Sequence, residues 1–247
     1  DWVVSFDATS LYPSIIMQYN QSPETFVEGH VKDTTVNGLL EGKYDLSDLQ
    51  NNDCTMTANG YCYTREKQGK FPEIVQKFFD DRQRYKKLMI AAEKEYEITK
   101  DSRLKNDISK YNNFQMARKI QLNSLFGALA NEYFRYYDAR IAEGITLSGQ
   151  LAIQWAERAI NKELNNILKT EDVDYVIAID TDSLYINFGP FIEKLKPEDP
   201  VKALDKICGD HFEKILAASY QDLADKTNAY KNRMVMAREA IADKAIW

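Results

Sequence analysis

Two aspartates separated by a single residue lie between two short apolar runs rich in β-forming residues. Asp180 and Asp182 belong to Asp180-Thr-Asp-Ser183, which follows residues 175–179 and precedes residues 184–188. This pattern predicts a hairpin of two buried strands that presents both carboxylates at its turn. Carboxylates held so close together need a compensating cation, and a hard divalent ion is the first candidate. A turn capped by its own Asp and Ser side chains would have the same local sequence, so the choice depends on the rest of the chain.

A third carboxylate is predicted at the end of another strand. Residues 2–6 have the apolar pattern of a buried strand and run directly into Asp7. Pro13 is well placed to be the first residue of a helix that continues to Tyr19. The turn between Asp7 and Pro13 would then offer free N–H groups at a helix N-terminus, where an anion can bind. A metal-binding carboxylate beside such amides suits a nucleoside triphosphate with its cation.

Positive charge is concentrated in one segment of a chain whose net charge is −6. Residues 65–119 contain 15 Lys and Arg against 9 Asp and Glu, which leaves 17 against 29 for the remainder. This asymmetry predicts that the basic segment binds a polyanion while the acidic remainder holds metal. A solvated pair of basic helices would produce the same charge pattern.

The basic segment is predicted to form two long helices. Apolar residues recur at helical spacing over residues 71–100, with Pro72 near the start, and again after the polar stretch 100–107 as far as about residue 131. Two sets of side chains share a helix face by their spacing: Arg82 with Lys86 on the first helix, and Lys119, Asn123 and Phe126, next to Gly127, on the second. Arg82 and Lys86 could instead pair with Asp80, Asp81 or Glu93, and Phe126 could belong to the core.

The other segments are predicted to form a scaffold. Residues 20–70 contain turn signals and short β-prone pieces, which indicate loops and one or two small hairpins. Long helices are predicted over residues 139–168, where Gly144 and Gly149 permit tight packing, and over residues 200–226, where His211 is expected at the surface or in the core. A strand is predicted over residues 233–237, with Glu239 just beyond its end.

Composition excludes several classes of protein. With 247 residues, 44% of them hydrophobic, the chain can form one large domain or two small ones. Its three cysteines lack the spacing of a zinc site or a disulfide framework, which favours a reducing compartment. No apolar run has membrane-spanning length, and the first residues do not resemble a signal peptide. Because no polar tail precedes the first strand or follows residue 243, we expect a piece of a longer protein.

Three segments together resemble a known enzyme family. Residues 7–16, 119–127 and 180–183 look like motifs A, B and C of family B DNA polymerases, in the correct order. The sequences 134–138 and 238–242 are most similar to replicative polymerases of large tailed bacteriophages. Two positions depart from the family pattern: Ala178-Ile179 stands where an aromatic residue and glycine are usual, and Phe126 stands where tyrosine is usual.

The resemblance implies an α+β fold with an antiparallel palm sheet packed on helices and an inserted antiparallel two-helix fingers subdomain. Residues 1–70 would form the N-terminal part of the palm, 71–131 the fingers and 132–247 the C-terminal part of the palm. The implied activity is DNA-directed DNA polymerase, which extends a primer on primer–template DNA with dNTPs during viral DNA replication. The resemblance further implies a sliding clamp and other replication proteins, bound through regions outside this chain, and the cytoplasm of an infected bacterium.

The resemblance also implies a role for each motif residue. Two Mg²⁺ ions would be held by Asp7, Asp182 and the carbonyl of Ala8, with Asp180 as an outer partner. The triphosphate would bind to the amides of Ser10 and Leu11 and to Arg82, Lys86 and Lys119, and Lys119 is also a candidate acid for the pyrophosphate. Asn123 would support this face, Phe126 and Gly127 would lie against the nascent base pair, and Tyr12 would lie under the sugar as its discriminator.

Other interpretations use the same carboxylates. A metal-dependent nuclease could share them, but it would not need the basic helix pair. A degenerate polymerase domain could hold DNA without chemistry, although both key aspartates are present. Protein-primed members of the family carry insertions near these motifs, whereas only 57 positions separate Asn123 from Asp180, most of them in one predicted helix. Tyr12 could also be a core residue packed on Ile15 and Ile16.

Overall fold

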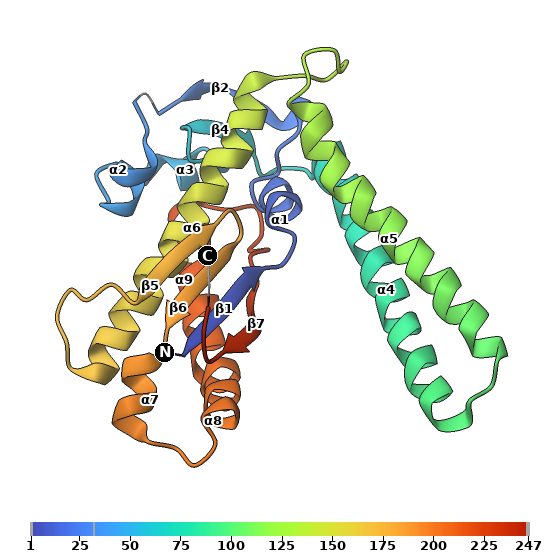
Figure 1. Cartoon of the computed structure of the whole chain (residues 1–247). Coiled ribbons are helices and arrows are strands. Elements are labelled where there is room, and N and C mark those ends of the chain that lie inside the picture. The colour runs from blue at the N-terminus through green and yellow to red at the C-terminus, as the bar shows by residue number, and fades with distance from the viewer. Residues whose placement is uncertain (1, 32, 246–247) are drawn as a thin grey trace.

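A four-stranded antiparallel sheet lies at the centre of the main body (Figure 1). The structure is a computed structural model that describes residues 2–31 and 33–245. The central sheet has the order β5-β6-β1-β7, formed by β1 (Val3–Ala8), β5 (Val176–Asp180), β6 (Ser183–Asn187) and β7 (Met236–Ala242). The expected α+β class and the hairpin around residues 181–182 are therefore confirmed.

The strands differ in burial because of their positions in the sheet. β1 lies between two partners, and Val4 and Phe6 are fully buried. β5 is an edge strand that pairs only with β6, and its Ile177 and Ile179 are 47% and 40% exposed. The prediction that both strands of the hairpin are buried is wrong for β5, because an apolar run does not reveal which strand lies at an edge.

Four helices of the described chain pack on or beside the sheet and contribute a large part of the core. They are α6 (Ala139–Leu168), α7 (Gly189–Leu195), α8 (Pro200–Ile207) and α9 (Glu213–Lys226). α6 packs against both α9 and the hairpin strands, and its inner face is buried at Ile145, Ile160 and Leu164. The helix predicted over residues 200–226 is interrupted by a π-helical turn, Cys208–Phe212, that its apolar spacing did not predict.

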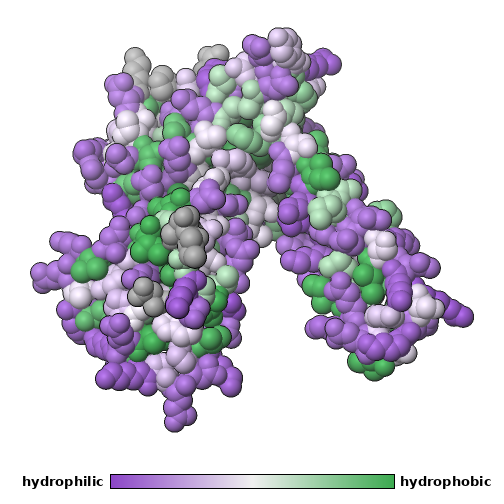
Figure 2. All heavy atoms as spheres, viewed as in Figure 1, coloured by the Kyte–Doolittle hydropathy of each residue, from purple (hydrophilic) through white to green (hydrophobic). Residues whose placement is uncertain are grey.

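A helical arm extends away from this body (Figure 1). It consists of α4 (Lys70–Thr99) and α5 (Arg103–Leu129), which pack along each other and agree closely with the two predicted helices. Both prolines taken as helix starts lie at the third helical residue instead: Pro72 in α4, and Pro13 in α1 (Leu11–Gln18). Proline is tolerated there because the first N–H groups of a helix have no intrahelical acceptor. The arm and body diverge, which leaves an open notch between them (Figure 2).

Residues 20–70 form a second, smaller layer. Its three-stranded sheet has the order β2-β4-β3, formed by β2 (Phe26–His30), β3 (Cys54–Met56) and β4 (Tyr61–Thr64), and its short helices are η1 (Pro23–Thr25), α2 (Val36–Leu40) and α3 (Asp48–Asn51). The expectation of loops and small hairpins holds for β3 and β4, while the addition of β2 was not predicted. Among the described residues, no helix is long and apolar enough to cross a membrane.

Candidate active site

The pairing of β1 with β6 brings the two principal aspartates together. Asp7 lies opposite Ser183, whose hydroxyl donates to Asp7 Oδ2 over 3.3 Å. Directly beside this pair, the N–H of Ala8 donates to the carbonyl of Asp182 over 2.8 Å. The hairpin turn is tight, with Thr181 in the left-handed region (φ 40°) between Asp180 and Asp182. The carboxylates predicted at two separate strand ends therefore lie at one place.

The carboxylates at this place repel one another. The pKa of Asp7 is raised, first by burial and then by the negative charge of Glu239, although the Ser183 hydrogen bond opposes the increase. The pKa of Asp182 is also raised, by burial, by Asp7 and by Asp180. Glu239 takes part because it lies within β7, next to β1, and not beyond the strand's end as predicted. A bound cation would relieve all of these unfavourable interactions.

The oxygen ligands at this site suit a magnesium ion whose remaining ligands come from a substrate. Among the described residues, no group of three or more His, Cys, Asp or Glu side chains could hold a metal alone. Asp7 and Asp182 offer hard oxygen ligands, and Mg²⁺ is usually bound by one or two carboxylates together with substrate phosphates and water. The predicted carbonyl ligand, Ala8, is buried at the end of β1 between these aspartates. An incomplete protein cage is therefore compatible with a metal that arrives with a phosphate ligand.

The free N–H groups of Ser10 and Leu11, just after Ala8, form a site for an anion that we call the anion cradle. Ser10 precedes α1 in a left-handed conformation (φ 51°, ψ 61°) and its side chain makes no capping bond. The N–H of Thr9 donates to Val235, whereas none of the described hydrogen bonds uses the N–H of Ser10 or Leu11. These two amides at the start of an eight-residue helix are the donors predicted for phosphate.

A partly buried arginine reaches this cradle from the arm. Arg82 Nη1 donates to Ser10 Oγ over 3.1 Å, while its Nε is buried without a hydrogen-bond partner. Burial lowers the pKa of the Arg82 guanidinium, and no ion pair of the described residues includes it. Asp81 instead pairs with Arg84 and Arg118, at 3.1 Å and 3.2 Å. A partly buried cation without a counter-anion, beside free amides, favours an anionic ligand.

The other basic residues predicted for the site lie on the arm but make no described contact with the cradle. Lys86 and Lys119 are both exposed, on α4 and α5 respectively. They lie on the same arm as Arg82, and their exposure leaves them accessible to a ligand that binds along it. Gly127 on α5 is also exposed, and an added Cβ there would meet no described atom within 4 Å.

A pocket of about 320 Å³ joins the hairpin, the start of α1 and helix α5. Its lining residues are Ser10, Leu11, Tyr12, Pro13, Asn123, Phe126, Thr181 and Asp182. Six of the eight were predicted from the motifs, and the two that were missed, Pro13 and Thr181, lie within the same motifs. Across this pocket the rings of Tyr12 and Phe126 are in contact, with centroids 4.5 Å apart and planes at 43°. We call it the nucleotide pocket, after the ligand that its predicted residues imply.

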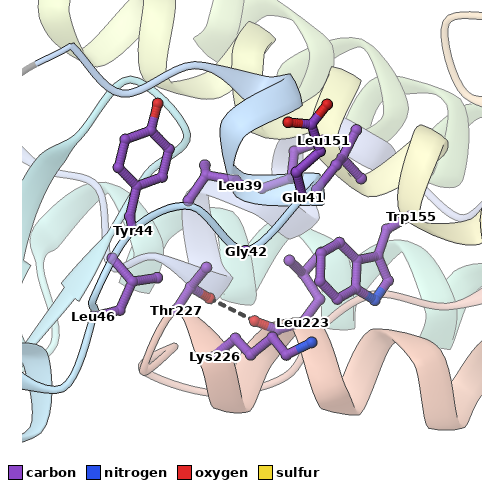
Figure 3. A pocket seen from close by; sticks show the side chains of 11 residues that line it. Leu39, Glu41, Gly42, Tyr44, Leu46, Leu151, Trp155, Leu223, Lys226 and Thr227 are labelled. Carbon is purple, nitrogen blue, oxygen red and sulfur yellow. Dashed lines mark hydrogen bonds between the residues drawn. The ribbon is translucent and has the colours of Figure 1, made fainter.

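Another pocket, of about 410 Å³, lies between α2, α6 and α9 (Figure 3). It is mainly apolar, with Leu39, Leu151 and Leu223 in its wall, and Lys226 lies 4.7 Å from the ring centre of Trp155. None of the predicted site residues lines it. The predicted chemistry therefore points to the nucleotide pocket, where Asp182 shares the wall with Ser10 and Leu11.

The sequence of this chain is similar to those of known DNA polymerases. Residues 1–196 match the sequence model of DNA polymerase family B. The chain is 33% identical to the DNA-directed DNA polymerase of Enterobacteria phage T4 and 32% identical to that of Escherichia phage RB69, in each case over 98% of this chain and 32% of the relative. It is 28% identical to the DNA polymerase delta catalytic subunit of Drosophila melanogaster over 76% of this chain and 16% of that protein. The chain thus spans about a third of the length of its phage relatives.

Proposed function

This chain belongs to DNA polymerase family B, and we propose that it forms the palm (residues 1–70 and 132–247) and fingers (residues 71–131) of a template-directed DNA polymerase. The proposal rests on the position of Arg82. This partly buried cation reaches from the arm to the anion cradle beside Asp7 and Asp182. A nuclease needs the carboxylates but not a basic arm that closes over a triphosphate. The substrates would be dNTPs and primer–template DNA.

The carboxylates would hold two Mg²⁺ ions. Asp7 and Asp182 supply the principal ligands, the carbonyl of Ala8 adds another, and Asp180 lies outside them as a second source of negative charge. When bound, Mg²⁺ supplies Lewis-acid activation of the primer 3′-hydroxyl and neutralises charge on the triphosphate. The raised pKa of Asp7 and Asp182 supports this assignment, because both charges are unfavourable without a cation.

The protein groups around the triphosphate bind and orient it for in-line displacement. Amides of Ser10 and Leu11 donate to phosphate oxygens, and Arg82 exchanges the neutral Ser10 hydroxyl for a phosphate acceptor. Lys86 and Lys119 extend the positive surface along the arm. The primer 3′-hydroxyl loses its proton to solvent as its oxygen bonds to the α-phosphorus. The bond from that phosphorus to the oxygen that bridges to the β-phosphorus breaks, and Lys119 donates a proton to the departing pyrophosphate.

The apolar side of the nucleotide pocket receives the sugar and base. The ring of Tyr12 lies under the sugar and leaves no room for a 2′-hydroxyl, so it excludes ribonucleotides. Phe126 and Gly127 lie against the nascent base pair, and Asn123 supports that face. Phe126 keeps the aromatic surface of the usual tyrosine and lacks only its hydroxyl.

Arg82→Ala in the complete polymerase tests the proposal. We expect at least a tenfold loss in kcat/KM for dNTP incorporation, because a buried charge-assisted contact with phosphate contributes about 1.5–3 kcal/mol. Arg84→Ala is the matched control, since Arg84 lies on the same helix but pairs with Asp81 and does not reach the cradle. Incorporation by Arg82→Ala at the rate of the Arg84→Ala control would contradict the proposal.

The wider role follows from the relatives. Two of them are phage polymerases, so we propose replication of viral DNA in the cytoplasm of an infected bacterium. A sliding clamp and other replication proteins would bind through regions outside this chain. Purification of the complete protein from infected cells, followed by identification of its bound partners, tests this role.

A further inference from the structure

The ring of Tyr12 separates two hollows. On one side is the nucleotide pocket, and on the other is a pocket of about 500 Å³ that we call the rear pocket. The rear pocket is lined by Leu11, Tyr12, Thr146, Gly149, Gln150, Ile153, Gln154, Ile179 and Thr181. Leu11, Tyr12 and Thr181 line both hollows. The proposed sugar discriminator therefore lies in the wall that the two pockets share.

Two residues from different helices contact this ring from the two sides. Phe126 of α5 lies on the side of the nucleotide pocket, with the ring centroids 4.5 Å apart. Gly149 of α6 lies on the side of the rear pocket and is buried. A methyl group at Gly149 would lie 3.3 Å from Tyr12 Cε1, 3.5 Å from Leu11 Cδ2 and 3.6 Å from Ile15 Cδ1. Because Gly149 has no side chain, the Tyr12 ring can occupy its present position.

We propose that Gly149 is a specificity-determining positioning residue, which sets how far the Tyr12 ring projects into the nucleotide pocket and thereby how strongly ribonucleotides are excluded. This inference rests on the proposed role of Tyr12 as the sugar discriminator. A contact of 3.3 Å is tighter than ordinary van der Waals contact, so an added methyl group displaces the ring by a few tenths of an ångström. Because Gly149 lies behind the ring, the displacement narrows the nucleotide pocket.

The test is Gly149→Ala in the complete polymerase, measured as kcat/KM for a ribonucleotide and for the matching deoxyribonucleotide opposite one template base. We expect the ratio of ribonucleotide to deoxyribonucleotide efficiency to fall about fivefold, the size expected when one methyl group overfills a packed contact. Gly144→Ala is the matched control. It adds the same methyl group to the same helix, but the added atom would meet Gln21, Asn59 and Thr57 and not Tyr12. The control should leave the ratio unchanged.

A double-mutant cycle distinguishes this inference from the proposed function itself. In the Tyr12→Ala background, Gly149→Ala should no longer change the ratio, because the ring through which it acts is absent. If Tyr12→Ala alone leaves the ratio unchanged, the proposed discriminator is wrong. If Tyr12→Ala raises the ratio while Gly149→Ala has no effect, or has the same effect in both backgrounds, only the positioning role of Gly149 is wrong.

A second variant keeps the test decisive if Gly149→Ala does not fold. Ile153→Val removes one methyl group from the wall of the rear pocket and so enlarges the space behind the Tyr12 ring. We expect the opposite sign, a modest rise in relative ribonucleotide efficiency. An unchanged or lowered ratio in this folded variant would overturn the proposal.

Discussion

Replacing Asp182 with asparagine removes one negative charge from the site and changes the shape of the side chain very little. The pKa of Asp182 is raised by burial and by repulsion from Asp7 and Asp180, and the pKa of Asp7 is raised by burial and by Glu239. A carboxyl group with a raised pKa costs folding stability when ionised, and that cost is relieved as the pH falls through the raised pKa. The substitution should therefore affect stability and catalysis in opposite directions.

The expected sizes of the two effects are very different. Without Mg²⁺, the free energy of unfolding should rise by about 0.5 kcal/mol or less, because solvent screens these partly exposed charges. Primer extension with Mg²⁺ should fall by about a thousandfold or more, as it does when a group that stabilises transition-state charge is removed. DNA binding should remain nearly intact, since the substituted residue is not a cation. The increase in Tm that Mg²⁺ produces in the parent protein should shrink.

Three measurements on the complete polymerase check this prediction: single-nucleotide primer extension, binding of labelled primer–template, and thermal unfolding with and without Mg²⁺. Asp180→Asn is the comparison, since it removes the same charge from the same hairpin at the proposed outer position, and its loss of extension should be smaller. Near-normal extension by Asp182→Asn would refute the metal-ligand role. A loss of extension accompanied by equal losses of DNA binding and Tm would show that Asp182 acts structurally.

Two further predictions concern the sugar and the DNA. Tyr12→Ala should raise ribonucleotide incorporation sharply and change deoxyribonucleotide incorporation only modestly, as measured by kcat/KM for each opposite one template base, whereas a core role for Tyr12 would lower both together with Tm. The isolated 247-residue chain should bind primer–template weakly and extend it little, because phosphate contacts dominate DNA affinity and only residues 65–119 offer cations in excess. Processive extension by the isolated chain in a gel assay would contradict the second prediction.

Local patterns predicted those elements whose causes are local. The arm helices were located to within a few residues because their apolar spacing persists over 30 and 27 residues. The turn at residues 181–182 was located because its polar residues separate two β-rich runs. The addition of β2 to the small sheet was missed, since it depends on contacts between segments about 35 residues apart.

The site shows the same division between local and non-local causes. Asp7 and Asp182 were predicted at strand ends, and the pairing of β1 with β6 joins them. The contact between Ser10 and Arg82 could not be predicted from spacing, because the two residues are 72 positions apart. The left-handed conformation of Ser10 was also not predicted. Glu239 was placed outside its strand because only the pairing of β7 with β1 shows how far that strand extends.

Two contacts join the arm to the body at the nucleotide pocket, and a substrate would change both. One is the hydrogen bond from Arg82 to Ser10, and the other is the packing of Phe126 on Tyr12. The hydrogen bond from Arg82 to the Ser10 hydroxyl has one ionised partner, whereas a hydrogen bond to phosphate has two and can be bidentate, which makes it stronger. A bound triphosphate therefore offers Arg82 a better partner than Ser10 does. Since the same arm carries Phe126, we expect binding of the phosphates to affect the ring that contacts the proposed sugar discriminator.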